Sequence, residues 1–232
     1  MDAFATVRIG PGPLADVRVG AGACLREDLE RLTIDPPRAV LLVGEGHLGA
    51  DDSRPPTPAG LRDPAALVAA LPAPTVAVWT GDASGAAAEV LLAADVRVCG
   101  AGATMAFPEV GRGELPCWGG TQRLPRVVGP ALALRMLLLG DAADAVTLAR
   151  TGGAAVAPDP LGAARELAAR LADGAPRALA AARDAVLRGL DLTLAEGLRL
   201  ESDLNLLLST TDDRAEGIAA FFEKRPPRFT GR

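Results

Sequence analysis

Aromatic residues are scarce in this chain of 232 residues: they make up 3% of it, and tyrosine is absent. Proteins that bind single-stranded nucleic acid stack the bases on aromatic rings, so this class of partner is not expected. The only histidine is His47, which excludes mechanisms that need two imidazoles. The three cysteines, Cys24, Cys99 and Cys117, are too few and too scattered for a disulfide framework or a four-thiolate zinc site.

Charge and hydropathy restrict the partners and the location of the protein. Lys and Arg total 24 against 29 Asp and Glu, which gives a net charge of -5 and a pI near 5.0, so a nucleic-acid partner is again not expected. No stretch reaches the roughly 18 apolar residues of a membrane span. The first residues lack the basic and apolar regions of a secretory signal. We therefore expect a soluble cytoplasmic protein with no membrane partner.

The spacing of apolar residues predicts alternating strands and helices in the first half of the chain. Strands are expected at 7–9 and 17–19, joined by a proline-rich turn, and at 39–43, 75–79, 96–98 and 105–107; helices are expected at 24–32, 65–71 and 85–94. The second half is rich in Ala and Leu, and its period predicts helices at 131–139, 161–171, 177–187, 194–208 and 213–223. The fold class is therefore α/β with a helical C-terminal region.

A glycine motif at residues 44–49 follows the strand predicted at 39–43 and matches the dinucleotide-binding pattern GxGxxG. A dinucleotide site requires a helix that begins on this loop, with its N-terminus facing the pyrophosphate. Pro55 and Pro56 follow instead, and a proline pair does not continue a helix. We expect no dinucleotide cofactor here and a surface-loop position for His47.

Two glutamates, Glu89 and Glu109, are the candidate chemical groups, and each follows a strand–turn unit. Glu89 lies early in the helix that begins after Gly85. The first N–H groups of a helix have no intrahelical acceptor and lie at its positive end, so they can stabilise an oxyanion. Two carboxylates over one pocket can act as acid and base. In the alternative, Glu89 only stabilises the helix dipole and Glu109 is an exposed loop acid; the spacing alone leaves both open.

Several motifs, in order along the chain, resemble the enoyl-CoA hydratase/isomerase (crotonase) superfamily. They are residues 74–78 with the turn through Glu89, residues 94–97, the segment Phe107-Pro108-Glu109-Val110, residues 119–129 and residues 216–226 at the closing helix. The resemblance covers roughly residues 38–232.

The resemblance implies a spiral core of ββα units, expected over residues 1–158, and a helical C-terminal trimerisation region over residues 159–232. It implies a homo-oligomer, either a trimer or a dimer of trimers, that binds an acyl-CoA thioester as substrate and uses no cofactor and no metal. The expected activity is that of a hydro-lyase, the syn addition of water to a trans-2-enoyl-CoA. Two alternatives stay open: an enoyl-CoA double-bond isomerase, which needs only the Glu109 position, and a catalytically silent acyl-CoA-binding subunit.

Motif positions in the resemblance also assign roles to single residues. The two N–H groups of the oxyanion hole belong to Ala50 and Ala86. Glu89 helps to activate the water, and Glu109 exchanges the proton at the α-carbon of the acyl chain. The remaining residues expected to bind substrate or CoA are Leu48, Asp51, Gly85, Trp118, Gly119, Phe221 and Lys224.

The C-terminal helix is expected to reach the CoA of a neighbouring subunit, since Phe221 and Lys224 match positions that do so in related enzymes. The positive charge of Lys224, Arg225 and Arg228 is expected to meet the CoA phosphates.

The sequence departs from the family pattern near both glutamates. The usual glycine run before the first glutamate is Gly85-Ala86-Ala87-Ala88, which adds methyl groups close to the expected thioester. Arg112 and Glu114 stand where apolar residues are common. Glu114 can enter the pocket as a third carboxylate or face solvent, and both interpretations stay open.

Overall fold

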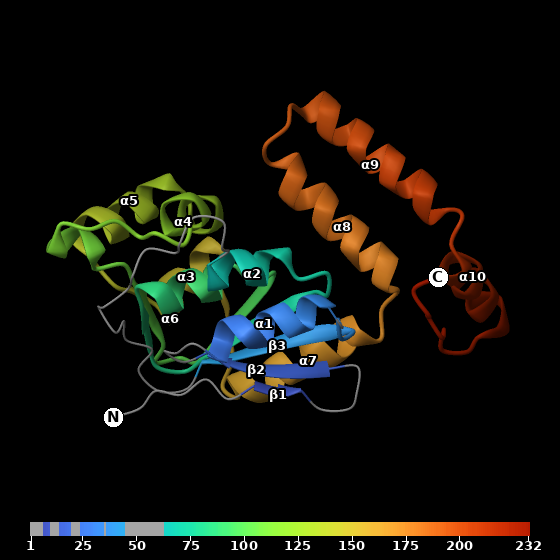
Figure 1. Ribbon diagram of the computed structural model, residues 1–232, viewed down its shortest axis with the longest axis horizontal. Helices are drawn as coiled ribbons and strands as arrows, with labels where there is room; N and C mark the ends of the chain where they lie inside the picture. The colour runs from blue at the N-terminus through green and yellow to red at the C-terminus, as the bar shows by residue number, and fades with distance from the viewer. Residues whose placement is uncertain (1–6, 10–13, 20–23, 35, 45–62) are drawn as a thin grey trace.

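A six-stranded sheet organises the first part of the molecule (Figure 1). The structure is a computed structural model that describes residues 7–9, 14–19, 24–34, 36–44 and 63–232. The strand order is β1 (Val7–Ile9), β2 (Leu14–Val19), β3 (Ala39–Gly44), β4 (Thr75–Trp79), β6 (Val96–Cys99) and β9 (Ala155–Val156). β1 and β2 pair antiparallel, which confirms the predicted hairpin, and the other neighbours pair parallel.

A second, three-stranded sheet joins β5 (Asp82–Ser84), β7 (Thr104–Ala106) and β8 (Ala143–Asp144). β5 runs parallel to β7, with Ser84 opposite Ala106, and β8 is antiparallel to β7. The sequence pattern does not predict β5, β8 or β9: β8 and β9 are only two residues long, and Asp82-Ala83-Ser84 of β5 contains a single apolar residue, so none of them shows a period.

Helices cover both faces of the larger sheet. α1 (Cys24–Ile34), α2 (Pro64–Ala70) and α3 (Ala86–Leu92) lie over one face and α7 (Pro160–Ala172) over the other (Figure 1). Along β3, Val40 and Leu42 belong to the large core cluster, whereas Leu41 and Val43 pack in a second cluster with Ala164 and Ala168 of α7. Because every position of β3 is buried, the strand reads as one continuous apolar run, as the sequence predicts.

Three helices and a short 3-10 helix extend this core beyond α3: η1 (Glu109–Arg112), α4 (Gly120–Val128), α5 (Pro130–Leu139) and α6 (Ala145–Thr151). α5 is confirmed, but α4 is not among the predicted helices. Its segment opens with two glycines and contains Pro125 inside the helix, and both residue types argue against a helix in a sequence. Contacts of α4 with α3 and α5 stabilise it instead.

The C-terminal helices leave the sheet. α8 (Pro176–Gly189) and α9 (Leu194–Leu208) form an antiparallel hairpin, and α10 (Asp212–Glu223) lies at the far end (Figure 1). Arg183 fastens α8 to the core: it donates to Asp95 Oδ1 at 2.6 Å, to the Leu71 carbonyl at 2.7 Å and to the Ala69 carbonyl at 2.5 Å. The predicted helical C-terminal region is confirmed. α7, which follows the predicted boundary at residue 158, packs on the sheet, and the division into two domains stays a prediction.

Among the residues that the structure describes, no helix combines the length and the hydropathy that are needed to cross a bilayer.

Candidate active site

Gly85 makes the turn from β5 into α3 and fixes where that helix starts. Its φ of 57° and ψ of -129° are backbone angles that a side chain would strain. Its N–H donates to the Ala106 carbonyl at 3.2 Å, so the start of α3 is tied to the end of β7. The N–H groups of Ala86 and the next residues then form the open first turn of the helix, with no side chain capping it. The role of the Ala86 N–H in an oxyanion hole stays a prediction.

Glu89 lies one helical turn after Gly85 and is completely buried. Its own N–H donates to the Gly85 carbonyl at 3.0 Å. Its Oε1 accepts two backbone hydrogen bonds, from the N–H groups of Trp118 and Gly120, both at 2.8 Å. A buried carboxylate is stabilised by such donors, and these two lie at the positive N-terminus of α4.

Glu109 is also buried, with 2% of its surface exposed, so the alternative of an exposed loop acid is wrong. It begins η1, three residues after Ala106. Since β5 and β7 are parallel and the Gly85 N–H binds the Ala106 carbonyl, the segments that carry Glu89 and Glu109 leave the same end of the small sheet. The two buried glutamates therefore follow adjacent strand ends, and the first turn of α3 begins there.

The turn at residues 118–120 positions the donors that hold Glu89. Gly119 has a φ of 96°, and Arg123 donates from Nη1 to the Trp118 carbonyl at 2.5 Å. Trp118 and Gly119 thus lie beside Glu89, and the half-buried Trp118 ring packs against the main core; their role in binding substrate stays a prediction. Gly120 and Arg123 are not among the predicted site residues, although the glycine pair followed by an arginine four residues after Gly119 is a pattern that could indicate them.

The loop after Glu109 faces outward. Arg112 and Glu114 are exposed and lie 3.5 Å apart as an ion pair, so Glu114 faces solvent rather than entering the site. Within the described ranges, no three or more His, Cys, Asp or Glu residues gather as a metal-binding group.

The predicted site residues Leu48, Ala50 and Asp51 lie outside the described residues, as do His47, Pro55 and Pro56. They include the second predicted N–H of the oxyanion hole.

The predicted CoA-contacting residues of the closing helix lie on α10, well away from α3 in the same chain (Figure 1). Phe221 is 79% exposed, and Lys224 ends the helix in a left-handed conformation with a φ of 55°. Neither joins Glu89 and Glu109 within one chain, which is compatible with the expected contact to a neighbouring subunit.

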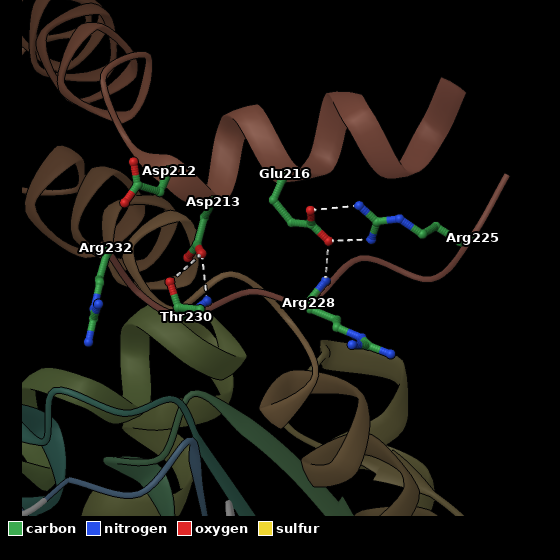
Figure 2. A pocket seen from close by; sticks show the side chains of 7 residues that line it. All are labelled: Asp212, Asp213, Glu216, Arg225, Arg228, Thr230 and Arg232. Atoms are coloured by element: carbon green, nitrogen blue, oxygen red, sulfur yellow. Dashed lines mark hydrogen bonds and ion pairs between the residues drawn. The ribbon is translucent and has the colours of Figure 1, made fainter. Parts of the chain in front are cut away.

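Arg225 is engaged inside its own chain rather than presented to a ligand. Figure 2 shows its guanidinium facing Glu216, to which it donates two hydrogen bonds at 2.6 and 2.8 Å. The Glu216 carboxylate and then that of Glu223 raise the pKa of Arg225 above its ordinary value. Reciprocally, Arg225 and then the Arg228 backbone N–H lower the pKa of Glu216 to about 2. Arg225 is therefore a structural cation, and the expectation that it meets CoA phosphates is not supported.

Comparisons with known proteins agree with this geometry. The model of the family "Enoyl-CoA hydratase/isomerase" matches residues 58–232. The 2,3-dehydroadipyl-CoA hydratase of Escherichia coli (strain K12) is 41% identical over 162 residues, which are 68% of this chain and 64% of that protein. The mitochondrial enoyl-CoA hydratase domain-containing protein 2 of Bos taurus is 40% identical over 171 residues, 71% of this chain and 58% of that protein. The chain thus spans about three fifths of the length of these curated relatives.

Solved structures extend the similarity over nearly the whole fold. An enoyl-CoA hydratase from Bacillus anthracis superposes with a TM-score of 0.85 at 25% identity, covering 98% of this chain and 99% of the other. An enoyl-CoA hydratase subunit from Geobacillus kaustophilus HTA426 gives 0.82 at 29% identity, with 98% of both chains covered. The family model matches most of the chain, and the motifs and the fold agree with it. The chain therefore belongs to the enoyl-CoA hydratase/isomerase (crotonase) family.

Proposed function

We propose that the protein is an enoyl-CoA hydratase that adds water to the double bond of a trans-2-enoyl-CoA thioester. One observation carries the proposal: two buried carboxylates, Glu89 and Glu109, follow the adjacent ends of β5 and β7, where the open first turn of α3 begins. Hydration needs one group to take a proton from water and another to give a proton to carbon. An isomerase needs a single shuttle, so a second carboxylate held in place at the site favours hydration.

Glu89 is the proposed base for water. Its Oε1 is held by the N–H groups of Trp118 and Gly120, so we assign proton transfer to Oε2. As a water proton passes to Oε2, the water oxygen forms a bond to the β-carbon of the enoyl group. The π pair of the double bond shifts to form a double bond between the α-carbon and the thioester carbon, and the carbonyl π pair moves onto the thioester oxygen, which gives an enolate.

The start of α3 would stabilise this enolate. The Ala86 N–H lies at the helix terminus, where the positive end of the dipole favours an oxyanion, and Ala50 is the proposed second donor. Glu109 then gives its proton to the α-carbon and the enolate collapses to the hydroxyacyl thioester. Delivery of both groups from the same side gives syn addition, and proton exchange with solvent restores both carboxyl groups.

The CoA portion is proposed to bind across two subunits. Leu48, Asp51, Gly85, Trp118 and Gly119 would line the thioester end, and Phe221 and Lys224 of a neighbouring copy would contact the CoA. Exposure of Phe221 supports this arrangement. The proposed assembly is a trimer or a dimer of trimers.

The test is hydration of crotonyl-CoA, followed as the loss of absorbance of the conjugated thioester. Glu89→Gln and Glu109→Gln should each lower kcat by about 10²–10⁴, the usual contribution of a positioned acid or base, with little change in KM. The Gln side chain at 89 can still turn its amide oxygen toward both N–H donors, so the fold should be kept. Glu114→Gln is the matched control, since Glu114 is a solvent-exposed carboxylate of the same loop, and it should retain full activity.

Other outcomes identify the alternatives. If the protein forms a conjugated product from a 3-enoyl-CoA but does not hydrate crotonyl-CoA, it is an isomerase, and Glu109→Gln should then be severe and Glu89→Gln mild. If it binds CoA esters and converts none of them, the silent-subunit alternative replaces the proposal.

A further inference from the structure

The backbone at residues 118–120 forms a small anion-binding turn whose occupant is the Glu89 carboxylate. The N–H groups of Trp118 and Gly120 point to the same oxygen, Oε1, at 2.8 Å each, which is the geometry in which alternate N–H groups of a turn cradle an anion. The turn fits closely: a Cβ on Gly120 would lie 3.1 Å from Oε1 of Glu89 and 2.9 Å from Cβ of Pro116. A shift of this turn would therefore move or release the carboxylate.

Helix α4 satisfies the carbonyl groups of the same turn, and Arg123 makes the decisive contact. The Gly119 carbonyl accepts from the N–H groups of Gln122 at 3.0 Å and Arg123 at 2.8 Å. The Trp118 carbonyl accepts from the Arg123 side chain at 2.5 Å. Both carbonyls are thus bound on the α4 side, while the N–H groups of Trp118 and Gly120 face Glu89.

The guanidinium of Arg123 also lies directly over Gly119. A Cβ at position 119 would overlap Nη1 of Arg123 and lie 3.1 Å from its Cζ. The missing side chain of Gly119 is thus what lets Arg123 reach back across the turn, while the φ of 96° directs the chain from Trp118 into α4. Arg126 lies three residues after Arg123 on the same helix, and its side chain donates instead to the Gln122 carbonyl and to Asp191.

We infer that Arg123 is a positioning residue for the proposed base: it locks the turn at residues 118–120, whose two N–H groups hold Oε1 of Glu89 and so fix the orientation of the carboxylate. It touches neither substrate nor reacting atoms and acts through Glu89. The inference rests on the proposed function only in that Glu89 takes the proton of water.

The experiment compares Arg123→Met, Arg123→Lys and the control Arg126→Met in crotonyl-CoA hydration. Arg123→Met keeps an apolar stem but removes the bond to the Trp118 carbonyl, so kcat should fall about 10- to 100-fold, the effect of a misplaced catalytic group, with KM within about twofold. Arg123→Lys retains a cation that can reach the same carbonyl and should recover part of kcat. Arg126→Met should match the unmodified protein.

A double-variant cycle separates positioning from a general loss of structure. If Arg123 acts through Glu89, adding Arg123→Met to Glu89→Gln should cost no more than about twofold, because the group that it positions is already gone. Independent losses that multiply would overturn the inference, as would a fall in kcat that Arg126→Met shares.

A crystal structure of Arg123→Met distinguishes failure of this inference from failure of the proposed function. We expect the turn to shift and at least one of the two bonds to Glu89 to lengthen beyond hydrogen-bonding distance. If both bonds persist unchanged, Arg123 does not position Glu89, whatever the enzyme converts. If the bonds are lost but the unmodified protein hydrates no enoyl-CoA, the proposed function fails and the structural link from Arg123 to Glu89 stands.

Discussion

At the scale of single residues, Gly119 combines a conformational and a steric requirement. Its φ of 96° costs a non-glycine residue about 1–2 kcal/mol, and a side chain there would also displace Arg123. Gly152, which ends α6 with a φ of 78° and has open space around its Cα, meets only the first requirement.

Gly152→Ala should therefore lower the free energy of unfolding by about 1–2 kcal/mol, and Gly119→Ala should lower it by more, because its side chain also displaces Arg123; denaturant titration measures both. Only Gly119→Ala should also lower kcat, by about tenfold or more, because it disturbs the turn that holds Glu89. Equal activity of the two variants would show that the turn tolerates the lost Arg123 contact.

At the scale of elements, α10 depends on the segment that follows it. Arg225 and the Arg228 backbone N–H donate to Glu216, and the Thr230 N–H donates to Asp213 at 2.6 Å (Figure 2). The Gly231 N–H also donates to Asp213, at 2.9 Å. Arg38 reaches the Phe229 carbonyl from the core side. The contacts with Glu216 and Asp213 hold residues 225–232 against α10, and the Arg38 contact links the same segment to the core. Together they fix the orientation of α10, which carries Phe221.

The Glu216–Arg225 pair makes the stability of this element depend on pH. Because the pKa of Glu216 falls from 4.5 to about 2 on folding, the carboxylate stabilises the folded state fully above about pH 4.5, and this contribution is lost as the pH falls toward 2. Glu216→Gln should lower the thermal midpoint at pH 6, and its difference from the unmodified protein should shrink between pH 4.5 and 2. Glu201→Gln, a change of an exposed glutamate on α9, should show no such trend; a difference that is constant with pH would contradict the assignment.

At the scale of the whole molecule, the α8–α9 hairpin leaves much of its apolar surface exposed to solvent in a single chain. Neither helix contains a buried residue, and four apolar side chains of the hairpin are 54 to 79% exposed: Val186, Leu190, Leu194 and Leu198. Helices of this length are stabilised mainly by packing of an apolar face, and a connected apolar surface of this kind indicates a subunit interface.

We therefore expect light scattering at micromolar concentration to give three or six times the 23.6 kDa of one chain. Leu194→Asp with Leu198→Asp should shift the protein toward the monomer, because each buries a charge in the interface. Ile34→Asp is the control, since Ile34 is 85% exposed but lies on α1. A monomeric unmodified protein would exclude this assembly.

The sequence by itself determined most elements and both candidate carboxylates. β3 and β4 are uninterrupted apolar runs because both faces of the sheet are covered, and α5 and α7–α10 repeat at the helical period because each has one apolar side. The order of motifs around Glu89 and Glu109 identified the family before any contact was known. These features are local, so they can be recognised in a linear pattern.

Only the tertiary structure decided what surrounds those carboxylates. Glu109 is buried by the folded chain around it. The N–H donors that hold Glu89 lie 29 or more positions further along the chain. The contact of Arg123 with Trp118 depends on the turn that Gly119 makes possible. α4 forms despite Pro125 because α3 and α5 pack against it. The engagement of Arg225 by Glu216 was likewise invisible in the sequence, since a cluster of basic residues carries no indication of which one its own chain neutralises.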